Sequence, residues 1–201
     1  LDELVASSDT GGRAADGPIG KFILLVALAW SLFQLWFASP FPFMVGFGVF
    51  NDTEARSIHL AFAIFLAFAA FPAARSKFQL GLGVIIPIIL AVLFMIGAKD
   101  GTATWWIPVV AVAVVAAIIL GSPKDRIPLW EWAMAIIGAG AALYLYVAYT
   151  AISGRVGAPI QTDFIVAVIG LMLLLEATRR ALGPALMIVA SVFLIYTVLG
   201  P

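Results

Sequence analysis

The chain has 201 residues, of which 64% are hydrophobic and only 11% are charged, and its eleven basic residues balance its eleven acidic ones. A soluble domain is about 45–50% apolar, so the composition excludes a soluble globular fold and predicts an integral membrane protein. The neutral balance gives no indication of nucleic-acid binding. No cysteine is present, which excludes disulfides, thiolate metal sites and a cysteine nucleophile.

Two unlike segments open the chain. Small and polar residues dominate 1–19, so we expect a disordered cytoplasmic tail there. A membrane-spanning helix needs about 20 mostly apolar residues, and the first such run is 20–38. It begins a membrane domain that we expect to occupy 20–201.

The next segment, 41–50, is apolar and aromatic, and it includes Phe41 and Phe43. It is too short to cross a bilayer, so we interpret it as interfacial or re-entrant. Two roles remain open for it. It is either a loop lying on the bilayer surface or a surface for docking or gating.

The second predicted span covers 54–74, and Asn51 and Asp52 before it offer N-cap oxygens. Arg56 and His59 lie three residues apart, so they share one helix face near its start. For His59 two roles are open: a hydrogen-bonded structural group, or a proton relay.

Three further spans follow, over 80–97, 105–120 and 129–152. Pro87 is expected to kink or break the first of these helices. In the last one, Gly138 belongs to a set of small residues that allow close helix approach.

The last part of the chain predicts a transmembrane hairpin with a charged turn. Two apolar runs, 164–175 and 185–199, flank a group of charged and turn-forming residues: Glu176, Arg179, Arg180, Gly183 and Pro184. A charge at the bilayer centre costs about 3 kcal/mol or more, so these charges belong at a membrane surface or inside the protein. At spacings of i+3 and i+4, Glu176 can meet both arginines. A partly buried pair and an ordinary positive flank with a local salt bridge are both open.

The fold class is therefore an all-α, polytopic transmembrane bundle of about seven spans. The sixth span is left open because its apolar run, 164–175, is short.

Two motifs resemble one known family. The sequence LLLEATRRALGPAL at 173–186, followed by an apolar helix ending in YTVLGP, resembles the N-terminal membrane region of TRAP transporter permeases of the TAXI type. The sequence ARSIHLAFAIFLAFAAFPAAR at 55–75 is similar to the second membrane helix of that family, and Arg56 and His59 match its R-x-I-H-L motif. Together the motifs cover about a quarter of the chain.

The resemblance implies a function and partners. In this family a periplasmic solute-binding protein delivers an organic acid, and a cation gradient drives its uptake across the bacterial inner membrane. The expected partners are a large transport domain of the same permease, to which this chain would be the N-terminal scaffold, a TAXI-type binding protein and membrane lipids. No nucleic-acid partner is expected.

The basic residues predict an orientation, because cytoplasmic loops carry an excess of Lys and Arg. Alternating loops divide the eleven into eight on one side and three on the other. The eight are Arg13, Lys21, Arg75, Lys77, Lys124, Arg126, Arg179 and Arg180. The three are Arg56, Lys99 and Arg155. The N-terminus is therefore predicted to be cytoplasmic, and the opposite surface is the expected docking place for the binding protein. The candidate docking residues are Phe41, Phe43, Asp52, Arg56 and Arg155.

Motifs for chemistry are missing from the sequence. It contains no G-x-S-x-G, no H-E-x-x-H and no Walker loop. No Asp or Glu falls in the middle of a predicted span, although ion and proton paths usually need one there. We therefore expect no catalytic, substrate-binding or metal-binding residue, no cofactor and no enzyme activity. The alternative to a transporter scaffold is a stand-alone membrane assembly or regulatory protein without transport activity.

Overall fold

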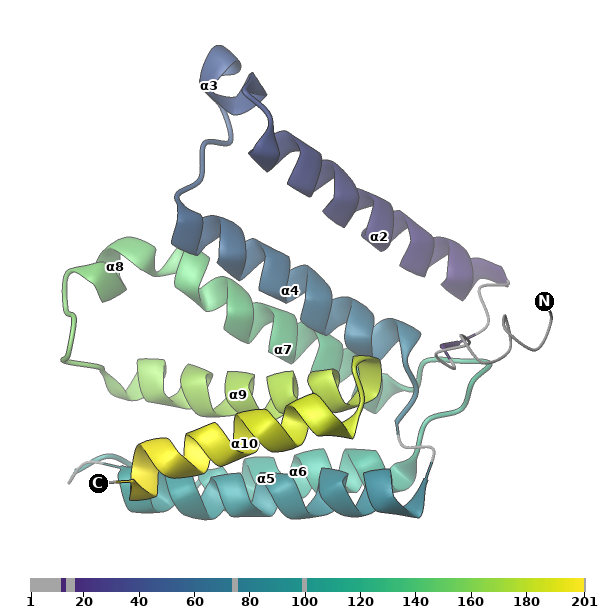
Figure 1. Cartoon of the computed structure of the whole chain (residues 1–201), viewed down its shortest axis with the longest axis vertical. Coiled ribbons are helices and arrows are strands. Elements are labelled where there is room, and N and C mark those ends of the chain that lie inside the picture. Colours follow the sequence, from purple (N-terminus) through teal and green to yellow (C-terminus); the bar gives the residue numbers. More distant parts are fainter. Residues whose placement is uncertain (1–11, 14–16, 74–75, 99–100, 201) are drawn as a thin grey trace.

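A computed structural model describes residues 12–13, 17–73, 76–98 and 101–200. Within these residues the regular structure is entirely helical (Figure 1). The helices are α2 (Gly17–Ala38), α3 (Phe41–Val45), α4 (Asp52–Ala70), α5 (Lys77–Gly97), α6 (Ile107–Leu120), α7 (Leu129–Val147), α8 (Tyr149–Ser153), α9 (Gln161–Ala181) and α10 (Pro184–Leu199). The predicted all-α bundle is confirmed.

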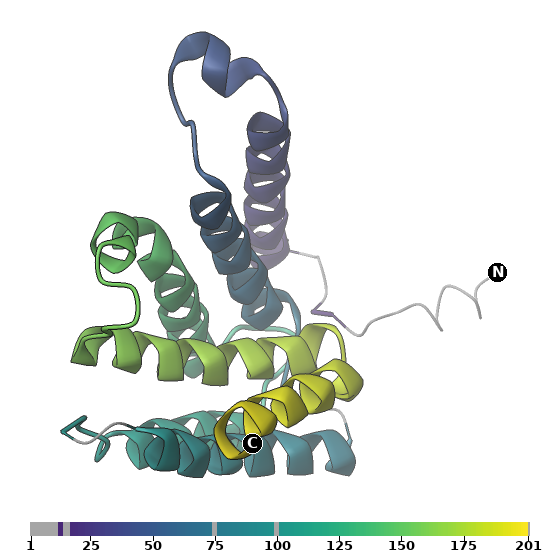
Figure 2. The same cartoon turned by 60° about the vertical axis from the view of Figure 1, so that its left-hand side comes forward.

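The long helices run back and forth along one another, so successive loops lie at opposite ends of the bundle (Figure 1). Helices α4, α6 and α9 finish, and α5, α7 and α10 begin, at what we call the basic end, on the right in Figure 1. The opposite end carries α3, α8 and the segment before α6. Helix α2 packs mainly on α4 and, with α3, projects from the rest of the bundle (Figure 2).

Among the residues that the structure describes, four helices, α2, α4, α5 and α7, are long and apolar enough to cross a membrane, and α6 and α10 are shorter apolar helices. The chain is therefore a membrane-embedded helical bundle. The uncertain sixth run belongs to α9, which extends the apolar core 164–175 at both ends into a helix of 21 residues.

Two predicted boundaries and one predicted helix break need correction. Helix α4 stops at Ala70 rather than at residue 74, and Pro72 follows closely; a proline disfavours helix in the residue before it. The span predicted over 129–152 is two helices, α7 and the short α8. Pro87 lies inside α5, which continues as one helix across it, so the helix is not broken there and the kink stays a prediction.

Parts of the predicted tail, 1–19, are structured. Helix α2 begins at Gly17, and Arg13 is buried in the protein, which corrects the prediction at these positions. The remainder of the tail, 1–11 and 14–16, lies outside the described residues, as do Arg75 and Lys99 from the charge count.

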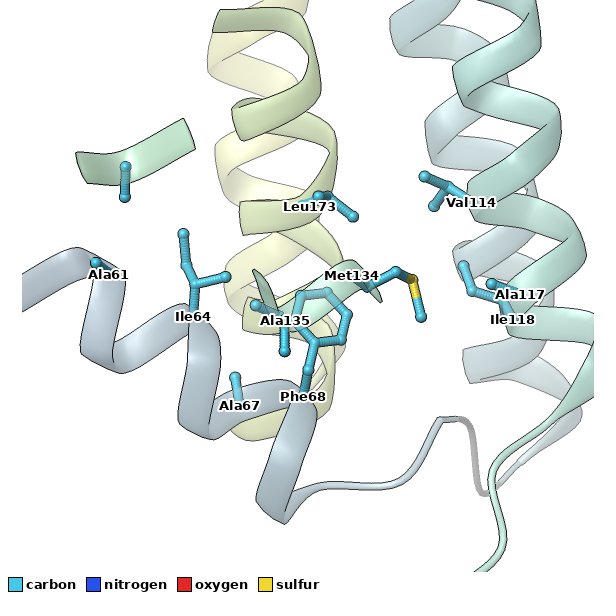
Figure 3. Packing of buried hydrophobic residues seen from close by; sticks show 12 residues of the cluster. Ala61, Ile64, Ala67, Phe68, Val114, Ala117, Ile118, Met134, Ala135 and Leu173 are labelled. Carbon is cyan, nitrogen blue, oxygen red and sulfur yellow. The ribbon is translucent and has the colours of Figure 1, made fainter. Parts of the chain in front are cut away.

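Two hydrophobic clusters form the core. The first joins α4, α6, α7 and α9 around residues such as Ile64, Phe68 and Ile118 (Figure 3). The second joins α5, α6, α9 and α10, with Leu90 and Met172 among its members. Because α6 and α9 contribute to both clusters, they connect the two halves of the bundle.

Gly138 should be sensitive to substitution because it lies where α7 meets α4. A Cβ atom there would lie 2.7 Å from Cγ2 of Ile64, whereas one at Gly140 on the same helix would meet nothing within 4 Å. Both alanine variants gain the same helix propensity, so their difference measures packing. We expect Gly138→Ala to be less stable than Gly140→Ala by about 1–3 kcal/mol in thermal unfolding in detergent. Equal stabilities would contradict the close approach.

The predicted orientation can be tested by cysteine labelling, since the natural chain has no cysteine. Asp125 and Ala158 are exposed at the basic and the opposite end, respectively. In intact cells, an impermeant maleimide should label Ala158→Cys and should reach Asp125→Cys only after permeabilisation. The reverse pattern would place the basic end outside.

Candidate functional site

Five charged side chains meet at the basic end of the bundle. None of them is more than 1% exposed as a side chain. We call this group the ionic network: Arg13, Glu131, Glu176, Arg179 and Arg180. It is the largest concentration of buried charge in the part of the chain that the structure describes.

Glu176 is the acceptor for both arginines of its own helix. Arg179 donates from Nε and Nη2 to the two carboxylate oxygens, each at 2.8 Å, and Arg180 donates from Nε at 2.6 Å. The two-bond geometry to Arg179 is the strong, fork-like form of such a pair. The predicted i+3 and i+4 contacts are confirmed, and their burial supports the buried pair rather than a solvated flank.

Arg180 extends the network to another helix. Its Nη1 donates to Oε1 of Glu131 on α7 at 2.6 Å, and its guanidinium carbon lies 4.7 Å from the ring centroid of Phe68. The ring face attracts a cation at this distance. Glu131 accepts from Arg13 through its other oxygen. The pairs therefore form one continuous chain from Arg179 to Arg13.

Arg13 also closes the end of α4. Its Nη1 donates to the carbonyl oxygens of Phe68 and Ala69 at 2.8 and 2.7 Å, and its backbone N–H donates to that of Ala70 at 2.8 Å. The last carbonyls of a helix have no partner within the helix, and a cation there is favourable. Arg13 thereby gives hydrogen bonds to the last carbonyls of α4 and to the carboxylate of Glu131 at the same time.

The network contains three cations and two anions, so it carries one excess positive charge. The partial charges of nearby helix ends offset this excess. Glu131 lies in the first turn of α7, and Arg179 and Arg180 lie in the last turn of α9. Each charge is at the helix end whose dipole favours it. Nη2 of Arg180 is buried without a hydrogen-bond partner among the described residues.

Gly183 and Pro184 form the turn directly after the network. Gly183 has φ +89° and ψ 177°, a conformation that essentially only glycine adopts. Pro184 occupies the start of α10, where its missing N–H has no cost. The two residues reverse the chain between α9 and α10, so their contribution is structural.

His59 lies between α2 and α4. Its Nδ1 accepts a hydrogen bond from Nε1 of Trp30 at 2.9 Å and lies 3.3 Å from Nε2 of Gln34. The ring of Phe33 is edge-on to it, with 5.1 Å between centroids. These contacts hold α2 against α4 and favour the structural alternative for His59 over the proton relay.

The candidate docking residues do not gather in one place. Phe41 and Phe43 are 57% and 74% exposed on α3, which lies far from α8 in both views (Figures 1 and 2). Arg56 pairs with Asp52 at 2.8 Å, and both side chains are largely exposed. Arg155, beyond α8, is instead part of a separate internal pair.

That pair forms a second polar site, at the opposite end. Arg155 donates from Nη2 and Nε to Asp163 of α9 at 2.7 and 3.1 Å, and the hydroxyl of Tyr144 donates to the same carboxylate at 2.5 Å. The hydrogen bonds to Asp163 raise the pKa of Arg155 above its ordinary value. A cavity of about 680 Å³ lies beside these groups, between α4, α7, α8 and α9.

Sequence reasoning missed two members of the network. Glu131 carries one signal that could have found it, a lone carboxylate inside the apolar sequence LWEWAMA; a buried carboxylate needs a cation. Arg13 carries no such signal, because small and acidic residues surround it.

Among the described residues, no group of three His, Cys, Asp or Glu side chains could hold a metal ion. Comparisons with protein-family models, with curated proteins and with solved structures found no match to this chain. The chemistry of the site therefore has to be argued from its own geometry. That geometry is an internal brace, in which every carboxylate of the network faces arginines.

Removing Glu176 should destabilise the protein strongly, because buried Arg179 loses its carboxylate partner and buried Arg180 loses one of its two. We expect Glu176→Ala to lower the free energy of unfolding by about 3–5 kcal/mol. The matched control is Asp52→Ala, which breaks an exposed i,i+4 pair worth about 0–1 kcal/mol. Thermal unfolding in detergent measures both. If Glu176→Ala melted with the control, the network would not be a brace.

Proposed function

We propose that this chain is the N-terminal membrane scaffold of a binding-protein-dependent secondary transporter of the TRAP type, TAXI class, in the bacterial inner membrane. The transporter takes up organic acids with a cation gradient. In this proposal the transport site belongs to the large transport domain of the same permease. The chain described here holds that domain in the bilayer.

The proposal rests mainly on one observation: the charged residues of the motif that resembles the family join helices to one another inside the protein. The sequence EATRR belongs to the stretch that resembles the family, and its Glu176, Arg179 and Arg180 are all engaged in the buried network. They join α9 to α7 directly, and Arg179 also donates to the carbonyl of Gln79 in α5 at 3.3 Å. Charges used in this way brace helices and are not free to bind a solute.

The positions of the other charges support a scaffold too. In the described part of the chain, every Asp, Glu, Lys and Arg lies near a helix end or in a loop. A solute carboxylate at the bilayer midplane needs a cation or a broken helix N-terminus there. The scaffold proposal requires neither from this chain.

Uptake measurements test the proposal. Proteoliposomes containing the permease should accumulate a labelled organic acid only when both the solute-binding protein and a Na⁺ or H⁺ gradient are present. Uptake that needed neither would contradict the proposal. A chain that folded, bound no transport domain and supported no uptake would instead be the stand-alone assembly or regulatory protein.

Docking of the binding protein can be tested at Arg56, which is highly exposed at the opposite end. We expect Arg56→Glu to raise the binding-protein concentration at half-maximal uptake several-fold, because charges at an interface rim change association. Lys124→Glu reverses an exposed cation at the basic end and should leave the midpoint unchanged. Equal midpoints for wild type and both variants would remove Arg56 from the docking surface.

A further inference from the structure

The cavity at the opposite end has the size and walls of a binding site. Its volume, about 680 Å³, lies within the range of roughly 300–1,000 Å³ that is usual for ligand sites. Its walls are largely aliphatic and come from α4, α7 and α9: Leu60, Ile64, Leu145, Val166, Leu171 and Leu174. These helices belong to the membrane-embedded bundle, so the surroundings of the cavity supply hydrocarbon rather than water.

Small residues help to form the hollow. Ala141, Ala167 and Gly170 also line it, and a Cβ atom on Gly170 would lie 3.3 Å from the Cβ of Ala141. Helices α7 and α9 therefore touch through their smallest side chains here. Because these side chains do not fill the space beside the contact, the cavity persists next to a tight helix pair.

One end of the cavity is polar, and the acceptor positions of its carboxylate are all used. Asp163 accepts from the Tyr144 hydroxyl, from Nε and Nη2 of Arg155, and from the backbone N–H of Ile160. An ionised carboxylate offers about four acceptor positions, so Asp163 has none to spare. The bonds to Asp163 use two of the five N–H donors that the Arg155 guanidinium carries. The polar end therefore offers an N–H donor on a cation.

We propose that this cavity binds one acyl chain of a membrane phospholipid, with the lipid phosphate accepting a hydrogen bond from the Arg155 guanidinium. The pattern of one cationic donor at the mouth of an aliphatic hollow matches an amphiphile with an anionic head. Guanidinium groups bind phosphate oxygens well. Tyr144 and Tyr149 at the same end suit the level of lipid headgroups. The proposal is independent of the transporter scaffold.

Two other occupants fit less well. A water-soluble metabolite would need several polar partners on the walls, whereas these walls are largely aliphatic and the Asp163 carboxylate has no acceptor position left. A transmembrane helix is about 30 Å long and about 10–12 Å across, which requires several times the volume of this cavity. A single flexible acyl chain needs no polar partners on the walls and is small enough for the cavity.

Native mass spectrometry of the delipidated protein tests the proposal. Dioleoylphosphatidylglycerol should add back with a single saturable, tight site per chain. Dioleoylglycerol, which lacks the phosphate, should bind at least tenfold more weakly, and inorganic phosphate should not bind measurably. Equal affinity for dioleoylglycerol would overturn the role of Arg155, and binding of inorganic phosphate alone would overturn the role of the acyl chain.

Two variants separate the hollow from the donor. Ala167→Phe fills the cavity from α9 and should weaken the tight site at least tenfold, whereas Ala113→Phe places the same ring on the exposed face of α6 and should not. The double variant Arg155→Gln with Asp163→Asn removes the cation without leaving a lone charge, and should weaken phosphatidylglycerol but not dioleoylglycerol.

The double variant also guards against misfolding of Ala167→Phe, because it leaves the aliphatic walls of the cavity intact. Melting temperatures of all variants in detergent identify any that do not fold. If the folded double variant and Ala167→Phe both retained the tight phosphatidylglycerol site, the cavity would not be the lipid site and the proposal would be wrong.

Discussion

Burial of Arg180 is the constraint on which the arrangement of the bundle depends. A guanidinium is never neutral in a protein, and an unpaired charge away from water costs several kcal/mol. Arg180 therefore has to meet carboxylates, and it meets Glu176 and Glu131 at 2.6 Å each. Because Glu131 belongs to α7, this requirement sets how α7 and α9 face each other. The second oxygen of Glu131 in turn needs Arg13.

The ends of the helices explain why this charge gathers at one end of the bundle rather than in its middle. The carbonyls that finish α4 and the N–H groups that begin α7 have no partners in their own helices. Arg13 donates to the last carbonyls of α4, and Glu131 puts a negative charge in the first turn of α7, where the helix dipole favours it. At the basic end, the buried charges therefore lie at the helix ends that stabilise them. At the opposite end α7 stops at Val147 and the short α8 turns away, so packing there leaves a cavity.

The sequence predicts what is local and misses what is long-range. Apolar runs predicted the helices, and the spacing of Glu176, Arg179 and Arg180 predicted their contacts, because both depend on neighbours within a few residues. The pair of Arg13 with Glu131 joins positions 118 residues apart. No periodicity encodes such a pair, since it follows from how α4, α7 and α9 pack. The early end of α7 and the cavity behind it are tertiary features of the same kind.

The two ends differ in what would have to break for them to move. Separating helices at the basic end exposes several buried ions at once, and each broken pair costs about 3–5 kcal/mol. At the opposite end, the cavity between α7 and α9 means that part of their facing surfaces makes no mutual contact, so opening there sacrifices less. A bundle built in this way is rigid where its charges lie and adaptable where it is hollow. An acyl chain in the hollow would restore the missing contacts without adding charge, and would stiffen the end that the ionic network does not reach.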